Sequence, residues 1–566
     1  MPLVPQRLVR PAAYLLPILS FESDIFESGV RGADLVHLGF ATKMPIRESA
    51  PCVCYPVIDL FAGPGGLGEG FSALEHERVE FDVVLSVEKD PAAHRTLLLR
   101  SFFRQLVDDE QRQLYYQYLR GELTGEKLFA ACPAAAKEAK SRCLHLELGP
   151  HTTKGVYAHM RRLVSATEPW VLVGGPPCQA YSVVGRSRLA RQERERFETN
   201  EKHILYREYL RIIARYKPAV FVMENVKGLL SAKFGGDSTF RRIISDLTSP
   251  SVAVKESIRD RTPKTRRGGD YTILSLVGPS NGKLRPEDYL ILAEKYGVPQ
   301  RRHRLILLGV RSDLVVPECA RMRPSAGPSV HDVIADLPPL RSQLSREDDD
   351  SEAWAAAIRS LMRDFCPDDL DDGVRERMTG AIQCLRSNAG TGGRWVPMQN
   401  GCSLPATALT NWLHDPAMDF IVNHETRRHM REDLLRYLFA SSYARTGASP
   451  KLHQYPKELL PDHENVAQTV KDRHGFFNDR FRVQVENEPA TTVTSHICKD
   501  GHYFIHHDPT QCRSWTVREA ARVQTFPDNY FFEGTRTDQY RQVGNAVPPY
   551  LAVQISRIVA HVLSAQ

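Results

Sequence analysis

Five short apolar runs stand out along the first half of the chain, and most of them end in glycine or acidic residues. They are Val57–Phe61, Asp82–Val87, Trp170–Val173, Ala219–Met223 and Arg304–Val310. Short runs that are apolar almost throughout are typical of strands buried on both faces of a parallel sheet. We therefore expect these segments to be neighbouring parallel strands.

Helical patterns lie between the apolar runs. One helical face is formed by Ile204, Leu205, Ile212, Ile213 and Tyr216, and the helix ends before Pro218. Strands that alternate with helices predict a doubly wound α/β sheet. In such sheets, ligands bind beyond the carboxyl ends of the strands, so we expect catalytic and binding residues there.

The periodic pattern fades after Val310 and returns near the C-terminus. Acidic runs at 347–350 and 368–372 and a glycine-rich turn at 390–393 predict a second, smaller and irregular domain. Helices are expected again at Val517–Gln524 and from Tyr550 to Leu563. The expected organisation is an extension at 1–50, a main domain at 51–340, an irregular domain at 341–490, and a C-terminal part at 491–566 that returns to the main domain.

Composition adds limits to this picture. A chain of 566 residues with 42% hydrophobic and 25% charged residues is expected to fold as a multidomain globular protein. Its net charge of +6 suits a nucleic-acid partner without identifying one. The cysteines show no repeated spacing, and Cys52 and Cys54 form an isolated pair, so we expect reduced thiols and no metal site. No apolar run is long enough to span a membrane.

The first motif is the glycine-rich segment Asp59–Phe71, DLFAGPGGLGEGF, which joins a strand to a helix. Glycines allow a tight turn and a close approach of the backbone to a ligand. Their spacing differs from that of dinucleotide-binding turns, so the motif predicts another nucleotide-type site, with a purely structural turn as the alternative. Glu88 ends the next strand, where a carboxylate commonly binds the ribose hydroxyls of a nucleoside.

Three further motifs follow later strand ends. GGPPCQAYSVVGR places Cys178 on a proline-stiffened turn, and ENV places Glu224 beyond the next strand. In QRRHRLILLG, alternation along the strand directs Arg302 and Arg304 to the same side, where guanidinium groups could bind a phosphate or a carboxylate. Taken singly, these residues could also be a buried cysteine, a helix cap and a solvated strand entrance.

Together the motifs resemble the DNA (cytosine-5) methyltransferase family of the bacterial restriction–modification type. FAGPGG, PPCQ, ENV, QRRxR and finally GNAVPP, at Gly544–Pro549, follow one another in the family's order. The resemblance implies a Rossmann-like, S-adenosylmethionine-dependent methyltransferase domain whose cofactor site is completed by GNAVPP. It also implies that the irregular region is a target recognition domain, closed by TTVTSH at 491–496 and REAARVQTFPD at 518–528.

The resemblance implies a role for each matching residue. Cys178 attacks carbon 6 of a flipped-out cytosine, Glu224 contacts its N3 and exocyclic amine, and Arg304 with Arg302 orders the catalytic pocket. The implied S-adenosylmethionine site consists of Phe61, Gly63, Gly65, Gly66, Glu88, Pro177, Asn545 and Val547. The implied DNA contacts are Gln179, Ser182, Arg186, Arg188 and Thr492. The family's acidic residue after the third strand is hidden by an insertion between Val87 and Trp170.

Alternatives remain at this stage. A tRNA cytosine-5 methyltransferase would share the catalytic motifs but have a small recognition region, and a catalytically inactive binding protein would have lost PPCQ or ENV. A nicotinamide oxidoreductase has no use for PPCQ. Inserts at 100–165 and 238–285, the second with a basic stretch at 259–267, could contact DNA or be surface loops. The expected partners are double-stranded DNA and a cognate restriction endonuclease or defence system, with the protein a monomer in the bacterial cytoplasm.

Overall fold

The computed structural model describes most of the chain from Cys52 to Gln566. Outside the described residues lie 1–51, 150–151, 165–167, 178–200, 235–236, 256–270, 280–282, 347, 366, 368–369, 386–388, 400–402, 462–465, 467–477 and 500, together with the side chains of 201–204, 233–234, 237 and 255. The expected N-terminal extension and the basic stretch of the second insert are therefore not described.

An eight-stranded sheet forms the centre of the main domain, in the order β3-β2-β1-β4-β5-β11-β8, with β9 paired to β11. Its strands are β1 (Val53–Leu60), β2 (Val79–Glu88), β3 (Cys143–His145), β4 (Val171–Gly174), β5 (Val220–Val226), β8 (Tyr271–Leu274), β9 (Leu290–Leu292) and β11 (His303–Arg311). All five predicted strands are confirmed as strands. The doubly wound α/β fold is also confirmed.

One expectation about strand direction is wrong. The strands from β3 to β5 are parallel, but β11 runs antiparallel to β5, β8 and β9. An apolar run that is buried on both faces looks the same in either direction, so its composition cannot encode the sense of pairing. The sheet is therefore mostly parallel with an antiparallel edge.

Alternate residues of the strands pack on opposite faces of the sheet. Val57, Val173 and Val222 face one core, whereas Ile58, Leu172 and Met223 face the other. The first core is covered by α1 (Gly66–Ser72) and α20 (Pro549–Ser564). The second is covered by α6 (Thr153–Leu163), α9 (Glu201–Tyr216) and α10 (Thr239–Thr248), which α11 (Pro250–Lys255) follows. The expected helix before Pro218 is α9, and the expected C-terminal helix is α20.

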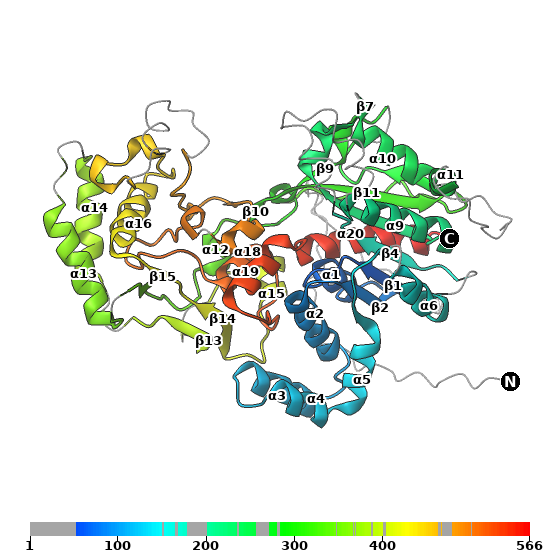
Figure 1. Cartoon of the computed structure of the whole chain (residues 1–566), viewed down its shortest axis with the longest axis horizontal. Coiled ribbons are helices and arrows are strands. Elements are labelled where there is room, and N and C mark those ends of the chain that lie inside the picture. The colour runs from blue at the N-terminus through cyan, green and yellow to red at the C-terminus, as the bar shows by residue number, and fades with distance from the viewer. Residues whose placement is uncertain are drawn as a thin grey trace, which may run out of the picture.

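Among the described residues, one stretch, Arg536–Ser564, is long and apolar enough to cross a membrane by length and composition. However, 78% of its apolar window is buried inside the protein. It contains α20, whose apolar face lies against the sheet beside α1 (Figure 1). A helix of the protein core explains the stretch fully.

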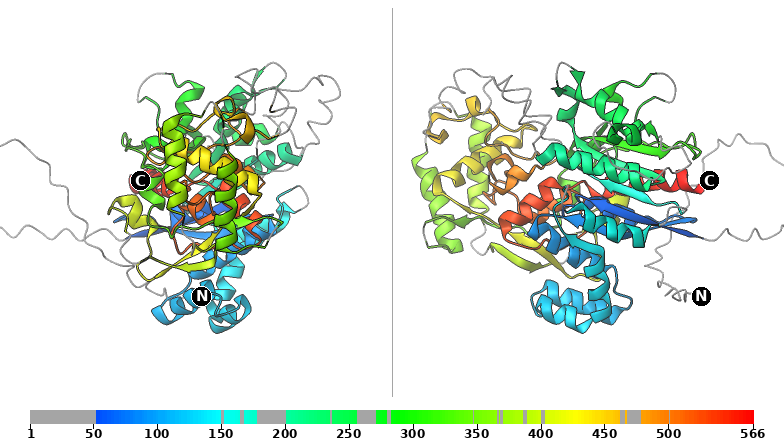
Figure 2. Two further views of the ribbon diagram at one scale, coloured as in Figure 1. Left: turned by 90° about the vertical axis from the view of Figure 1, so that its left-hand side faces the viewer. Right: turned by 45° about the vertical axis from the view of Figure 1, so that its right-hand side comes forward.

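The first insert forms α3 (Asp109–Leu119), α4 (Gly125–Ala131) and α5 (Pro133–Arg142) after α2 (Pro91–Phe103). These helices project from the lower side of the molecule in both views of Figure 2. Tyr116 donates to Asp415 Oδ2 at 2.8 Å, and the Arg394 guanidinium donates to the Tyr118 carbonyl at 2.9 Å. The first insert is therefore helical, and it packs against the irregular region.

The irregular region contains a helical lobe and a small hairpin. Figure 1 shows α13, α14 and α16 at the left, away from the main sheet. The helices α18 (Val517–Val523) and α19 (Arg536–Asn545) lie between this lobe and the sheet. The elements from the end of the sheet to this point are α12 (His331–Ile334), β12 (Gln343–Leu344), α13 (Ser351–Asp364), α14 (Asp372–Gln383), β13 (Gly392–Pro397), α15 (Ala408–Leu413), β14 (Phe420–Glu425), β15 (Arg428–His429) and α16 (Arg431–Ala444). A core of its own, centred on Trp354, Leu434 and Leu438, holds the lobe together.

The chain then returns to the sheet. The short strand β16 (Ala490–Thr491) pairs with β10 (Gln300–Arg301), and β6 (Lys233–Phe234) pairs with β7 (Asp237–Ser238) elsewhere. α18 (Val517–Val523) and α19 (Arg536–Asn545) lead into α20. The predicted helix near Val517 is confirmed, and Thr516 caps its first turn through the Glu519 N–H at 3.2 Å.

Candidate active site

The glycine-rich turn after β1 has the backbone conformation that its glycines permit. Phe61, Gly63 and Gly65 all have positive φ, at 57°, 58° and 100°. A Cβ at Gly63 would meet no atom within 4 Å, so the backbone there faces open space. Glu88, at the end of β2, accepts the Gly63 N–H on Oε2 at 2.8 Å and the Asp90 N–H on Oε1 at 2.7 Å. A fixed carboxylate therefore stands beside an open, glycine-lined turn.

The C-terminal GNAVPP segment closes against this turn. A Cβ at Gly66 would lie 2.2 Å from the Val547 carbonyl oxygen, so the two backbones approach too closely for any side chain at that position. Val547 is buried, and Asn545, the last residue of α19, is exposed. Tyr530 donates from its hydroxyl to the Pro64 carbonyl. The residues expected to form a cofactor site are thus neighbours in space at the carboxyl end of the sheet.

Glu224 lies beside the segment that leads into Cys178. A Cβ at Gly175 would be 3.0 Å from Glu224 Oε2, and Asn225 donates to the Pro176 carbonyl at 3.4 Å. Both contacts follow from the parallel pairing of β4 with β5, which aligns Gly174 with Met223. Pro177 is half-buried and is the last described residue before Cys178. The ENV and PPCQ motifs therefore meet at adjacent strand ends.

Arg304 and Arg302 contact different groups. Arg304 Nε lies 2.8 Å from Glu224 Oε1, across the β5–β11 pair. Arg302 is 2% exposed and donates to the carbonyls of Val493, Gly544 and Ala546 at 2.6, 3.2 and 2.8 Å. Burial, aided by the charge of Arg304, holds the pKa of Arg302 well below its usual range. Arg304 thus faces the Glu224 carboxylate, whereas Arg302 ties the TTVTSH and GNAVPP segments together.

Sequence reasoning missed two glutamines that complete this tie. Gln300 accepts the Val493 N–H at 2.8 Å and donates to Gln524 Oε1 at 2.8 Å. Gln524 in turn donates to the Val543 carbonyl at 2.6 Å. Both glutamines are fully buried. Their only sequence signal was membership in the QRRxR and REAARVQTFPD motifs, which does not reveal which backbone a side chain will reach.

The third strand, β3, follows the helices of the first insert. β3 pairs with β2 so that Glu88 is aligned with His145, and Glu147 follows two residues later. Glu147 Oε1 accepts from Lys89 Nζ at 2.8 Å, and both side chains are more than half exposed. An acidic residue therefore does follow the third strand, next to the segment after Glu88.

The expected DNA contacts are only partly described. Cys178, Gln179, Ser182, Arg186 and Arg188 lie outside the described residues. Thr492 is described, and its hydroxyl donates to the Arg301 carbonyl at 2.6 Å. That bond joins the closing segment to the QRRxR motif.

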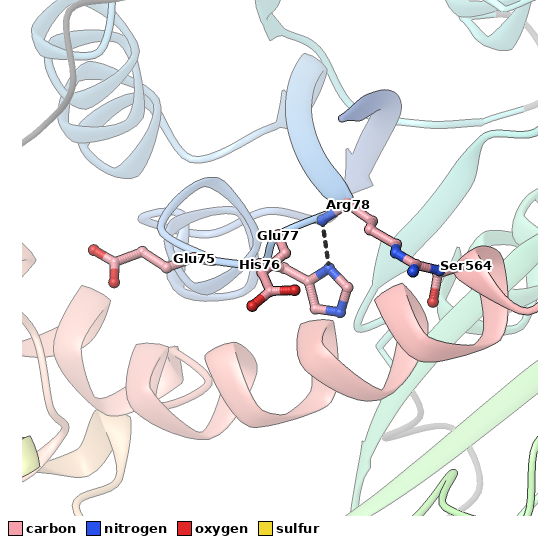
Figure 3. A pocket seen from close by; sticks show the side chains of 5 residues that line it. All are labelled: Glu75, His76, Glu77, Arg78 and Ser564. Atoms are coloured by element: carbon pink, nitrogen blue, oxygen red, sulfur yellow. Dashed lines mark hydrogen bonds between the residues drawn. The ribbon is translucent and has the colours of Figure 1, made fainter. Parts of the chain in front are cut away.

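A surface depression lies at the opposite end of the sheet, near the amino end of β2, and is not a second candidate for the active site. It is lined by Glu75, His76, Glu77, Arg78 and Ser564, as Figure 3 shows. The Arg78 N–H donates to His76 Nδ1 at 3.2 Å within it. The depression lies where β2 begins, whereas Glu88 is the last residue of β2. Ligands of doubly wound sheets bind at the carboxyl end, where the candidate residues gather.

Comparisons with known proteins indicate the family of this chain. The sequence model described as "C-5 cytosine-specific DNA methylase" matches residues 161–255 and 411–561. Type II methyltransferase M.Bpa9945I of Bacillus paralicheniformis is 32% identical over 529 residues, covering 90% of this chain and 99% of that protein. Type II methyltransferase M.AgeI of Thalassovita gelatinovora is 26% identical over 537 residues, covering 90% and 99%. A crystal structure of a DNA modification methyltransferase encoded within an E. coli prophage covers 90% of this chain and 99% of that one, at 18% identity and a TM-score of 0.49. The full-length relative at 32% identity decides the assignment: the chain belongs to the C-5 cytosine-specific DNA methylase family.

Proposed function

We propose that this DNA (cytosine-5) methyltransferase acts through a covalent bond between Cys178 and carbon 6 of a flipped-out cytosine in a specific duplex site. The observation that carries the proposal is the position of Glu224 against Gly175, with Asn225 holding Pro176, at the entrance to Cys178. These contacts place the Glu224 carboxylate beside the segment that leads into Cys178, which supports a carboxylate and a thiol that act on one target base. A base inside a duplex cannot reach this site, so it must leave the stack.

The chemistry divides among few side chains. Carbon 5 of cytosine is a weak nucleophile, and addition of the Cys178 thiolate to carbon 6 raises its electron density. Glu224 holds a proton at N3, where negative charge develops as the bond to carbon 6 forms. Arg304, 2.8 Å from the carboxylate, keeps Glu224 aimed at the base. After transfer, loss of the carbon 5 proton to a base or to water releases Cys178.

The family's cofactor is S-adenosylmethionine, and the residues around the glycine turn fit it. When bound, it supplies an electrophilic methyl group. Gly63 offers bare backbone toward open space, and Glu88 offers a fixed carboxylate for ribose hydroxyls. We assign the site to Phe61, Gly63, Gly65, Gly66, Glu88, Pro177, Asn545 and Val547, and we add Glu147 as the acidic residue for the adenine amino group.

We further propose the setting in which the enzyme acts. The relatives are named as type II methyltransferases, which supports a role in restriction–modification, beside a cognate endonuclease or another defence system. The protein would then work as a monomer on DNA in the bacterial cytoplasm. The segment at 341–490 would select the target sequence, with Gln179, Ser182, Arg186, Arg188 and Thr492 contributing contacts to DNA.

The test is a trapped complex with a fluorinated base. Bisulfite sequencing of DNA from cells that express the chain first identifies the methylated site. A duplex carrying 5-fluorocytosine at that site should then form an adduct that survives denaturing electrophoresis, because fluorine leaves no proton to eliminate. The adduct should require S-adenosylmethionine and form in preference on DNA rather than on fluorinated tRNA.

Cysteine variants supply the control. Cys178→Ala should form no adduct, whereas Cys319→Ala, which alters an exposed free cysteine, should behave as the original protein. An adduct that persists in Cys178→Ala would assign the nucleophile to another cysteine. A preference for tRNA would favour an RNA-directed enzyme instead.

A further inference from the structure

Three side chains from distant parts of the sequence converge where α12 meets the segment that leaves the recognition region. His331 Nδ1 lies 3.1 Å from Glu486 Oε1, and His507 Nε2 lies 3.8 Å from the same oxygen. One ligand atom from each of the three residues lies within 4.8 Å of the others. Because 155 and 21 positions separate them in the sequence, no ligand spacing revealed the cluster, and no metal was expected.

The backbone fixes the geometry of this cluster. The His331 N–H donates to the Glu486 carbonyl at 2.9 Å, and the Val330 N–H donates to the Glu488 carbonyl at 3.0 Å. Arg445, the residue that follows α16, pairs with Glu486 Oε2. Oε1 is therefore the oxygen left for a ligand. The cluster is held by main-chain pairing and by an ion pair, not by three mobile surface side chains.

His507 is the most informative member. It is 7% exposed, and its ring stacks on His506 with centroids 4.5 Å apart. His507 Nδ1 is buried without a hydrogen-bond partner among the described residues. The buried ring therefore has one nitrogen without a partner, and its other nitrogen, Nε2, is the one that lies 3.8 Å from Glu486 Oε1.

The 3.1 Å between His331 Nδ1 and Glu486 Oε1 would suit a hydrogen bond, but the longer separation in the cluster would not. A separation of 3.8 Å between His507 Nε2 and Glu486 Oε1 is too long for a hydrogen bond. Two ligands about 2.1 Å from one tetrahedral ion lie roughly 3.4 Å apart. The observed separations of 3.1 and 3.8 Å fall on either side of that value. His331 is half exposed, so solvent has access for a fourth ligand.

We propose that His331, Glu486 and His507 bind a zinc-class transition-metal ion, with water as the fourth ligand. Two imidazoles and one carboxylate suit Zn²⁺, Co²⁺ or Ni²⁺ better than Mg²⁺ or Ca²⁺, which prefer oxygen ligands. The ion would fasten α12, just after the main domain's sheet, to the segments on either side of the closing motif. Arg445 places a positive charge beside Glu486, which opposes a cation and limits the affinity.

The test uses the full chain, purified without a histidine tag and freed of metal with a chelator. Addition of Co²⁺ should produce the visible absorption of a four-coordinate cobalt centre at one equivalent, and Zn²⁺ should displace it. Zn²⁺ should also raise the melting temperature, because an ion that binds only the folded state stabilises it. Both measurements are independent of methyl transfer and therefore of the catalytic proposal.

Variants decide which residues hold the ion. His331→Ala removes a half-exposed side chain and should fold, yet it should weaken Co²⁺ binding by more than roughly tenfold. Glu486→Gln should do the same. His453→Ala, at an exposed histidine of the same region, should leave the cobalt spectrum unchanged. An octahedral spectrum, no binding, or equal binding by His331→Ala would overturn the proposal.

Discussion

Arg302 and Arg304 enter the sheet two positions apart and end in different surroundings. Strand alternation predicts that both leave the backbone on one side, but Arg302 lies between β10 and β11, and alternation does not reveal how far each side chain reaches. Arg302 reaches three carbonyls of the closing segments, and Arg304 stops at Glu224. One arginine therefore holds the closing segments together, and the other faces the Glu224 carboxylate.

Lysine substitutions should separate these two roles. Lysine keeps the charge but lacks the guanidinium fork, so Arg302→Lys should cost roughly 1.5–3 kcal/mol for each charged hydrogen bond that it fails to replace. The melting temperature should fall clearly. Arg304→Lys should melt like the original protein, but its turnover should drop by up to about a hundredfold as Glu224 loses its alignment. Equal effects of both variants on melting would contradict the division.

Asp59 should make stability depend on pH. Its side chain is fully buried, and burial raises its pKa to about 7, against the lowering effects of the Gly68 backbone and Arg104. The unfolded chain releases this proton near the ordinary aspartate pKa of 3.8, whereas the folded chain keeps it until the pH reaches about 7. Between these values the folded state binds more protons, so stability falls as pH rises.

Asp59→Asn removes the titrating group and keeps its shape. The advantage of the variant over the original protein should grow from about pH 4 to about pH 7 and then stay constant, and it should reach a few kcal/mol at roughly 1.4 kcal/mol per pKa unit. Thermal melting of both proteins across this range measures the difference. Parallel curves would show that Asp59 is ionised in the folded protein throughout.

At the scale of elements, sequence pattern identified what is locally encoded. Five of the eight strands of the sheet and the α9 and α20 helices follow from apolar runs and periodicity, and proline marks where α9 ends; β3, β8 and β9 were not predicted. The antiparallel sense of β11 and the packing of α3 against the hairpin were not predictable, because both depend on partners distant in the sequence. The same holds for Gln300 and Gln524, whose buried side chains bond to each other and to backbone groups of distant segments.

The contact between the glycine turn and GNAVPP is the element-scale feature most open to test. Gly66→Ala would place a Cβ 2.2 Å from the Val547 carbonyl oxygen, so the end of α19 or the start of α20 must move. We expect a loss of roughly 1–3 kcal/mol, as for overpacked cores, and weaker S-adenosylmethionine binding by calorimetry.

Gly155→Ala is its matched control. Gly155 lies within α6, where a Cβ would meet no atom within 4 Å, so alanine should stabilise the helix by up to about 1 kcal/mol. Cofactor binding should not change. If Gly66→Ala bound the cofactor as tightly as Gly155→Ala, the closing segment would not form part of the site.

At the scale of the whole molecule, the irregular region at 341–490 is an insertion between the sheet and the helices that complete the main domain. The first insert supports its β13–β14 part through contacts from Tyr116 to Asp415 and from Arg394 to Tyr118. The packing of this region therefore depends on two separate stretches of sequence.

A segment exchange follows from that arrangement. Replacing 341–490 with the equivalent of a relative of different specificity should transfer the methylated site, because the residues assigned to catalysis lie outside the segment. The first chimera should lose stability because its new segment no longer fits α3. Exchange of 104–142 from the same relative should restore that stability, since both sides of the contact would then come from one protein. Bisulfite sequencing and thermal melting read the two effects. An active chimera that keeps the original site would move recognition elsewhere, to the inserts at 100–165 or 238–285.

The packing of α20 on α1 also sets an order of events during synthesis. Ser556 Oγ donates to the Gly70 carbonyl at 3.4 Å across 486 positions of sequence, and Phe71 is buried in the core that α20 covers. A ribosome that has made the strands and the lobe has not yet supplied this cover. One apolar face of the main sheet therefore stays exposed on the growing chain until α20 has been synthesised. We expect chaperones and proteases to bind such incomplete chains.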